Sequence, residues 1–170
     1  FNTLISGIEE DPKKAVAYAG KLSDFFRDVV SVRDKDTISL GEELVLLRNY
    51  FALQQQRYGA SLQLIIDVSD SDSHKYKLPP LTLQLLTENA IKHNAISKDK
   101  NLQISIGIGN GEILQVSNNI NPRVSKAAGT GMGLQNINNR FNLLTNRKIK
   151  VTQDQHTFIV SLPLLKNHEP

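Results

Sequence analysis

The chain contains no cysteine and no tryptophan, and only one methionine among its 170 residues. Without cysteine, neither a disulfide bond nor a thiolate-bound metal site is possible, and the composition suits a reducing cytosol. The four histidines do not stand at metal-ligand spacing. Aromatic residues make up only 6% of the chain, but the apolar fraction of 39% still permits a hydrophobic core.

Long apolar runs and a strong excess of one charge are also missing. No stretch approaches the roughly 20 apolar residues of a membrane-spanning helix, and neither a signal peptide nor an initiating methionine is visible. The 20 basic and 17 acidic residues give a net charge of +3. Nucleic-acid-binding domains cluster their Lys and Arg more strongly, so we expect no direct nucleic-acid partner. The length fits one ordinary domain with an appendage.

The stretch of residues 78–95, LPPLTLQLLTENAIKHNA, is the most informative part of the sequence. Pro79 and Pro80 suit the first turn of a helix, and the pattern predicts one helix from there to about Asn94. One side of this helix is apolar, with Leu83, Leu86 and Ala90. That side is expected to pack against the core.

The other side of the same helix carries polar groups in its second half. Glu88, Asn89 and Lys92 fall within about 100° of arc, and His93 lies just beyond Asn89. An Asn carbonyl oxygen can hold nucleotide-bound Mg²⁺ without adding negative charge, and a Lys one turn on can meet a phosphate. A carboxylate beside the Asn can hold a metal-bound water. The alternative is a helix end that is polar only because it faces solvent.

A second stretch, GTGMGLQNINNRFNLL from Gly129 to Leu144, supports the chemical interpretation. Three alternating glycines precede a periodic apolar run of Leu134, Ile137, Phe141 and Leu144. A glycine segment that enters a helix offers backbone N–H groups and the positive end of the helix dipole to an anion. Taken alone, such a segment is also compatible with an ordinary loop.

Together the two stretches resemble the nucleotide-binding motifs of a known family. PPLTLQLLTENAIKH is similar to the N box of the GHKL ATP-binding fold, and more narrowly to that of the LytS/YehU-type sensor histidine kinases. GTGMGLQNINNRF resembles the glycine box of the same family. A third match lies upstream, carried by Leu47, Asn49, Tyr50, Gln54, Arg57 and Tyr58. The resemblance extends over nearly the whole chain.

The first residues, Phe1 to Leu4, resemble the last letters of the family's H box. On this match the phosphoacceptor His stands three positions before Phe1. We therefore expect a fragment that starts inside the H box. Residues 1–60 are expected to form partial dimerisation helices, and residues 61–170 the GHKL ATP-binding catalytic domain.

The resemblance implies an α+β fold: a two-layer α/β sandwich of GHKL (Bergerat) type with a mixed sheet of about five strands, preceded by two or three helices. The residue pattern agrees with this architecture. Asp11-Pro12 predicts the start of a helix that reaches about Val32, and Ser39 with Glu42 predicts a capping box. Strands are predicted at residues 62–68, 102–108, 113–116, 148–153 and 157–164, with a two-residue hairpin turn at Asn110-Gly111 and a polar loop at residues 69–77.

An apolar seam follows the capping box on one face of the next helix. It comprises Leu40, Leu44, Leu47, Phe51 and Tyr58. A seam of this kind packs against other helices. Two interpretations are open: core packing within one chain, and a helix bundle between two chains, which the resemblance favours.

The resemblance implies the catalytic core of a two-component sensor histidine kinase. Such a core binds Mg-ATP and transfers the γ-phosphoryl group to a His on an upstream helix, and then to a response regulator. Glu88 and Lys92 are implied as catalytic residues, and Asn89 as the Mg²⁺ ligand. The implied ATP-binding set is Asn89, His93, Asn118, Gly129, Thr130, Gly131, Gly133 and Leu134.

The family further implies a homodimer and a response-regulator partner, often of the LytTR type. A membrane link is expected only through a missing N-terminal region. The expected location is therefore the cytoplasmic face of the inner membrane.

The sequence departs from the family where the adenine is usually read. Asn118 stands in place of an Asp, and Ile120 in place of a Gly. An Asn oxygen can still accept a hydrogen bond from the adenine amino group, at a loss of roughly 1 kcal/mol of binding free energy relative to Asp. An Asn that rotates its amide can also donate a hydrogen bond to guanine. The departures leave a second hypothesis open, a degenerate, non-catalytic GHKL domain that acts as a dimerisation or interaction module. A gyrase- or MutL-like ATPase is disfavoured because Leu85 stands where those proteins carry a Glu.

Overall fold

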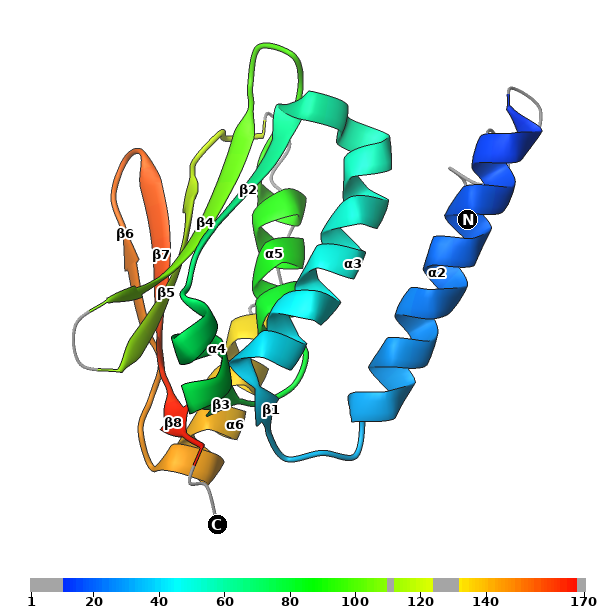
Figure 1. Cartoon of the computed structure of the whole chain (residues 1–170). Helices are drawn as coiled ribbons and strands as arrows, with labels where there is room; N and C mark the ends of the chain where they lie inside the picture. The colour runs from blue at the N-terminus through cyan, green and yellow to red at the C-terminus, as the bar shows by residue number, and fades with distance from the viewer. Residues whose placement is uncertain (1–10, 110–111, 124–131, 168–170) are drawn as a thin grey trace.

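The computed structural model of the chain describes residues 11–109, 112–123 and 132–167. A long helix lies beside a layered α/β unit, in which helices cover one face of a twisted sheet (Figure 1). The main helices are α2 (Pro12–Val32), α3 (Leu40–Tyr58), α5 (Thr82–His93) and α6 (Met132–Thr145). The predicted α+β class and two-layer arrangement are confirmed.

Local capping explains where the first two helices begin. The Asp11 side chain accepts a hydrogen bond from the Lys14 N–H at 3.2 Å, and Pro12 occupies the first turn of α2. At α3 the predicted capping box is present: Ser39 Oγ accepts from the Glu42 N–H at 3.1 Å, and Glu42 Oε2 accepts from the Ser39 N–H at 2.8 Å. Each start follows from residues within one turn of the helix end.

The main sheet has five strands in the order β2-β4-β5-β7-β6. Only β2 (Leu62–Asp67) and β4 (Leu102–Gly109) run parallel, and the other neighbours are antiparallel, so the sheet is mixed as expected. The remaining strands are β5 (Ile113–Asn119), β6 (Lys150–Gln153) and β7 (Thr157–Pro163).

The connection between β4 and β5 is one residue longer than predicted. Gly109 pairs with Ile113, so three residues rather than two lie between the strands. Glu112 adopts a left-handed backbone conformation with φ of 62°. Three-residue hairpin loops place a residue in that conformation beside the strand. The predicted turn residues Asn110 and Gly111 lie outside the described residues.

The predicted polar loop at residues 69–77 is wrong. It contains the short helix α4 (Asp70–Lys75), capped by Ser69, and the strand β3 (Tyr76–Leu78). The strand exists because it pairs on one side with β1 (Ile38–Ser39) and on the other with β8 (Leu165–Lys166). Both partner strands are distant in sequence, so the residues near β3 carry no local signal of this pairing.

The apolar seam of α3 packs inside the chain. Leu40 and Leu47 are fully buried and belong to the same hydrophobic cluster as Leu62 of β2 and Leu83 of α5. The interpretation of this seam as a contact between two chains is therefore wrong: the sheet and α5 already cover it. By contrast, α2 contacts α3 along one side only and leaves Val16, Phe26 and Val30 exposed.

Candidate functional site

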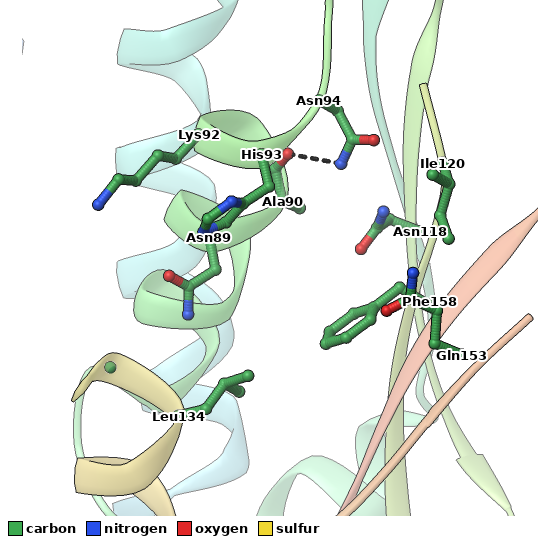
Figure 2. Close-up of a pocket in the computed structure, with 11 residues that line it drawn as sticks. Asn89, Ala90, Lys92, His93, Asn94, Asn118, Ile120, Leu134, Gln153 and Phe158 are labelled. Atoms are coloured by element: carbon green, nitrogen blue, oxygen red, sulfur yellow. Dashed lines mark hydrogen bonds between the residues drawn. The ribbon is translucent and has the colours of Figure 1, made fainter. Parts of the chain in front are cut away.

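A cavity of about 390 Å³ opens between α5 and α6 on one side and strands β5 and β7 on the other. This volume lies within the range of small-molecule sites. Figure 2 shows the lining residues of the helices on one side and those of the strands on the other. They are Asn89, Ala90, Lys92, His93, Asn94, Asn118, Ile120, Gly133, Leu134, Gln153 and Phe158.

The helix α5, which supplies one wall, begins later than predicted. It starts at Thr82, and a turn at Pro80 and Leu81 precedes it. Leu81 stands before the helix in the left-handed region with φ of 64° and makes no side-chain cap. Instead, the carboxylate of Glu43 on α3 accepts hydrogen bonds from the Leu81 N–H at 2.8 Å and the Leu83 N–H at 2.7 Å.

The polar residues of α5 divide between two surroundings. Asn89, Lys92 and His93 line the cavity, whereas the exposed Glu88 is not among the described residues that line it. The pKa of the Tyr50 hydroxyl on α3 is raised, first by burial and second by the negative charge of Glu88. Glu88 therefore acts electrostatically on α3. Figure 2 shows Lys92 extending away from the strands, toward the open side of α5.

The start of α6 approaches Asn89 closely. A Cβ atom at Gly133 would lie 3.4 Å from Nδ2 and 3.5 Å from Oδ1 of Asn89, so a larger residue there would press on this amide. Leu134 is half-buried and adds an apolar wall. The predicted ATP-binding residues Gly129, Thr130 and Gly131 lie outside the described residues.

Across the cavity from α5, Asn118 is a buried polar side chain, with 7% of its surface exposed. Its Nδ2 donates to the backbone carbonyl of Asn119 at 2.7 Å. A carbonyl can only accept, so this bond directs Oδ1, an acceptor, toward the cavity (Figure 2). Rotating the amide to donate would break the bond, contrary to the rotation considered from sequence.

Asn119 is engaged elsewhere. Its Oδ1 accepts from the Gln103 N–H at 2.7 Å, and its Nδ2 donates to the Asn101 carbonyl at 2.9 Å. These bonds hold β5 to the start of β4. Of the two adjacent Asn residues, only Asn118 faces the cavity.

Ile120, which replaces the family's Gly, fits its position without strain. Among the described non-glycine residues, a positive φ occurs at Leu81, Glu112 and Asn146, and not at Ile120. The Ile120 N–H donates to the His156 carbonyl at 2.8 Å. Its side chain lines the cavity and makes that wall more apolar.

Several cavity residues were not predicted. Phe158 faces the cavity because β7 pairs with β5 in a register that sets Phe158 beside Asn118, and Gln153 pairs with Phe158 in turn. Strand pairing over such distances leaves no local signal. Asn94 had a signal, an Asn at a helix end. Its Nδ2 donates to the Ala90 carbonyl at 2.8 Å, and its Oδ1 accepts from the Asn121 N–H at 2.7 Å.

The family model for histidine kinases matches residues 1–62. The sensor protein LytS of Streptococcus mutans is 35% identical over 159 residues, which cover 85% of this chain and 27% of that protein. LytS of Staphylococcus saprophyticus is 31% identical over 155 residues, 82% of this chain and 26% of that protein.

The chain belongs to the LytS family of sensor histidine kinases. The sensor histidine kinase/phosphatase LytS of Staphylococcus aureus is similar over 99% of this chain at 28% identity. This LytS-family chain spans about a quarter of the length of the Streptococcus mutans and Staphylococcus saprophyticus proteins.

Solved structures support the fold. The catalytic domain of the histidine kinase ThkA superposes with a TM-score of 0.53 at 16% identity and covers 75% of this chain and 95% of that one. The histidine kinase AdeS of Acinetobacter baumannii has a TM-score of 0.50 at 12% identity and covers 99% of this chain and 93% of that one. The expected GHKL architecture is thus confirmed for the LytS-family chain.

Two features are absent from the described ranges. No helix there is long and apolar enough to cross a membrane. Nor do three or more His, Asp or Glu side chains of residues 11–109, 112–123 and 132–167 gather as a metal-binding group. Mg²⁺ carried by a nucleotide needs few protein ligands, and the Asn89 side chain on the cavity wall offers an oxygen of the suitable kind.

Proposed function

We propose that this chain is the catalytic core of a two-component sensor histidine kinase that binds Mg-ATP in the cavity of Figure 2. In this reaction the bond between the γ-phosphorus and ADP breaks, and a bond to a His nitrogen of an upstream helix forms. The phosphoryl group then passes to a response regulator. The observation that carries the proposal is the buried acceptor Asn118, which lies across the cavity of about 390 Å³ from Asn89.

The residues have separate proposed roles. The adenine lies between Ala90 and Phe158, where Asn118 Oδ1 accepts from its amino group. Asn89 supplies an oxygen to Mg²⁺, and Lys92 meets a phosphate on the open side of α5. Glu88 orients the metal's water shell or a base from outside the cavity. These roles suit phosphoryl transfer, which depends mostly on positioning and charge stabilisation.

The glycine segment completes the proposed site. Gly133 leaves room for the Asn89 amide, and Gly129, Thr130 and Gly131 are proposed to fold over the phosphates. His93 and Leu134 line the cavity. Backbone N–H groups at the start of a helix are suited to phosphate oxygens.

Asn89→Ala tests the proposal, because alanine removes the Mg²⁺ ligand but keeps the helix. Calorimetry with Mg²⁺ and a non-hydrolysable ATP analogue should show binding to the wild type, weakened by about tenfold or more in the variant. Asn139→Ala on the exposed face of α6 is the matched control and should bind as the wild type does. Equal affinities for wild type and Asn89→Ala would remove Asn89 from the metal role.

The second hypothesis, a non-catalytic interaction module, is favoured only by the uncharged Asn118. It predicts that Mg-ATP does not bind even at millimolar concentration. The same titration therefore separates the two functions. The ordinary backbone of Ile120 and the orientation of Asn118 support the kinase.

Asn118 also allows a prediction about nucleotide choice. Because Oδ1 faces the cavity, it attracts the adenine amino group and repels the guanine carbonyl. We expect the wild type to bind ATP about tenfold more tightly than GTP, and Asn118→Ala to bring the ratio close to one. Asn119→Ala is the matched control, since that amide bonds to β4, and it should keep the wild-type ratio. An unchanged ratio in Asn118→Ala would exclude Asn118 as the base reader.

The wider partners and the location follow from the family and belong to the proposal. A homodimer would form along the exposed apolar side of α2, which carries Val16, Phe26 and Val30. A response regulator, of LytTR type by resemblance, would receive the phosphoryl group. The full protein would work at the cytoplasmic face of the inner membrane. The division into a dimerisation part, residues 1–60, and an ATP-binding part, residues 61–170, stays a prediction.

A further inference from the structure

Glu43 is a buried carboxylate to which the proposed reaction assigns no role. It lies on α3 with 1% of its surface exposed. Both of its oxygens are engaged: Oε2 accepts from the Leu81 N–H at 2.8 Å, and Oε1 accepts from the Leu83 N–H at 2.7 Å. Removing a carboxylate from water costs free energy, so a buried carboxylate at this position calls for a structural or functional explanation.

The two N–H groups belong to the N-terminus of α5, where the helix has no cap of its own. Leu81 precedes the helix and makes no side-chain cap. The first N–H groups of a helix lack partners within the helix, and a negative charge beside them is favourable to the helix dipole. Glu43 supplies both the acceptors and the charge from a different helix, about forty residues earlier in the chain.

A third element joins at the same place. Arg140 of α6 donates from Nη1 to the Pro80 carbonyl at 3.1 Å, and its positive charge is the one that acts on Glu43. Helices α3, α5 and α6 thus meet at the turn that opens α5. Two turns further along α5 lies Asn89, and two turns before Arg140 on α6 lies Gly133, where an added Cβ atom would lie 3.4 Å from the Asn89 amide.

We propose that Glu43 is a positioning residue for nucleotide binding: from α3 its carboxylate clips the N-terminus of α5, and with Arg140 it sets α5 and α6 at the spacing the cavity needs. This inference rests on the proposed function. A helix is rigid over three turns, so a shift at Leu83 displaces Asn89 and Lys92 with it. Because α2 packs against α3, the clip also links the position of those helices to the nucleotide site.

Glu43→Gln tests the clip with little change in shape. The amide NH₂ replaces one acceptor oxygen and meets an N–H donor, so one buried N–H loses its partner. We expect faster amide hydrogen exchange along residues 84–93 and Mg-ATP-analogue binding weakened about fivefold or more. Glu42→Gln, one residue away but exposed and bonded only within its own cap and to Lys35, is the matched control. It should leave both measurements unchanged.

Two further measurements distinguish a role in positioning the nucleotide site from a role in stability alone. Leu53→Ala, also on α3 and buried, lowers stability without touching the clip, and its folded form should keep the wild-type affinity. Burial raises the pKa of Glu43 to about 7, and a proton on the carboxyl removes one acceptor. The nucleotide affinities of the wild type and of Glu43→Gln should therefore become more alike as the pH falls from about 8 to about 6.

The outcomes distinguish this inference from the proposed function. If the wild type binds Mg-ATP and Glu43→Gln binds equally well, the clip is wrong and the kinase proposal stands. An equal loss of affinity in Leu53→Ala would also overturn it, whereas a ratio independent of pH would show only that Glu43 is ionised across this range. If the wild type binds no nucleotide, the kinase proposal fails, and unchanged hydrogen exchange in Glu43→Gln would refute the clip independently.

Discussion

Replacing Phe141 by alanine lowers the free energy of unfolding by about 3 to 5 kcal/mol. The Phe141 ring is fully buried on α6, in the cluster that joins α5 to the sheet. Truncation removes the ring and leaves a cavity that a close-packed core fills only in part. Urea unfolding followed by circular dichroism gives the difference in unfolding free energy.

Leu143→Ala is the matched control, because it removes a large apolar side chain from the same helix. Leu143 is 84% exposed, so its truncation should change the free energy of unfolding by no more than about 0.5 kcal/mol. A similar loss in both variants would mean that helix propensity, and not core packing, holds α6 in place. Leu144, which the periodic pattern placed on the buried face, is 37% exposed, and we expect it to contribute less than Phe141.

The second large effect concerns pH. Burial raises the pKa of Glu43 from its ordinary value of 4.5 to about 7, although the N–H groups of Leu83 and Leu81 and the charge of Arg140 oppose the rise. Between pH 4.5 and about 7, the Glu43 carboxyl therefore keeps its proton in the folded chain and has lost it in the unfolded chain. The stabilisation is fully present below pH 4.5 and is lost as the pH rises through about 7.

At about 1.4 kcal/mol for each pKa unit, this loss amounts to about 3 kcal/mol. The measurement is the free energy of unfolding of the wild type and of Glu43→Gln across this pH range. The difference between the two proteins cancels other titrating groups, and we expect the wild type to lose about 3 kcal/mol relative to the variant. A difference that stays constant with pH would show that Glu43 keeps its ordinary pKa in the folded chain.

The sequence alone predicted the elements whose determinants are local. Asp11-Pro12 and the Ser39–Glu42 box define helix starts within a few residues, and the structure has helices beginning at Pro12 and Leu40. The five strands of the main sheet were predicted from local sequence, and residues 102–108 in particular alternate in polarity as a half-buried strand does. The cavity wall formed by α5 was also largely predicted from local information. Helix periodicity gathers Asn89, Lys92 and His93 on one side of the helix.

The tertiary structure decided everything that depends on partners distant in sequence. β3 is a strand because β1 and β8 pair with it, and Phe158 enters the cavity through the register of β7 with β5. Whether the seam of α3 faces another chain or its own core could not be read from periodicity, which reports that a face is apolar and not what covers it.

The start of α5 shows the difference between the two kinds of information. Pro79 and Pro80 locally favour a helix start, and they predicted one there. The structure instead turns at Leu81 with a positive φ and begins the helix at Thr82, because Glu43 bonds the N–H groups of Leu81 and Leu83. The sequence determined which side chains α5 presents, since that depends on spacing along one chain segment. Where α5 begins and what holds it were decided by a carboxylate about forty residues away, since a hydrogen bond depends on distance in space and not on distance along the chain.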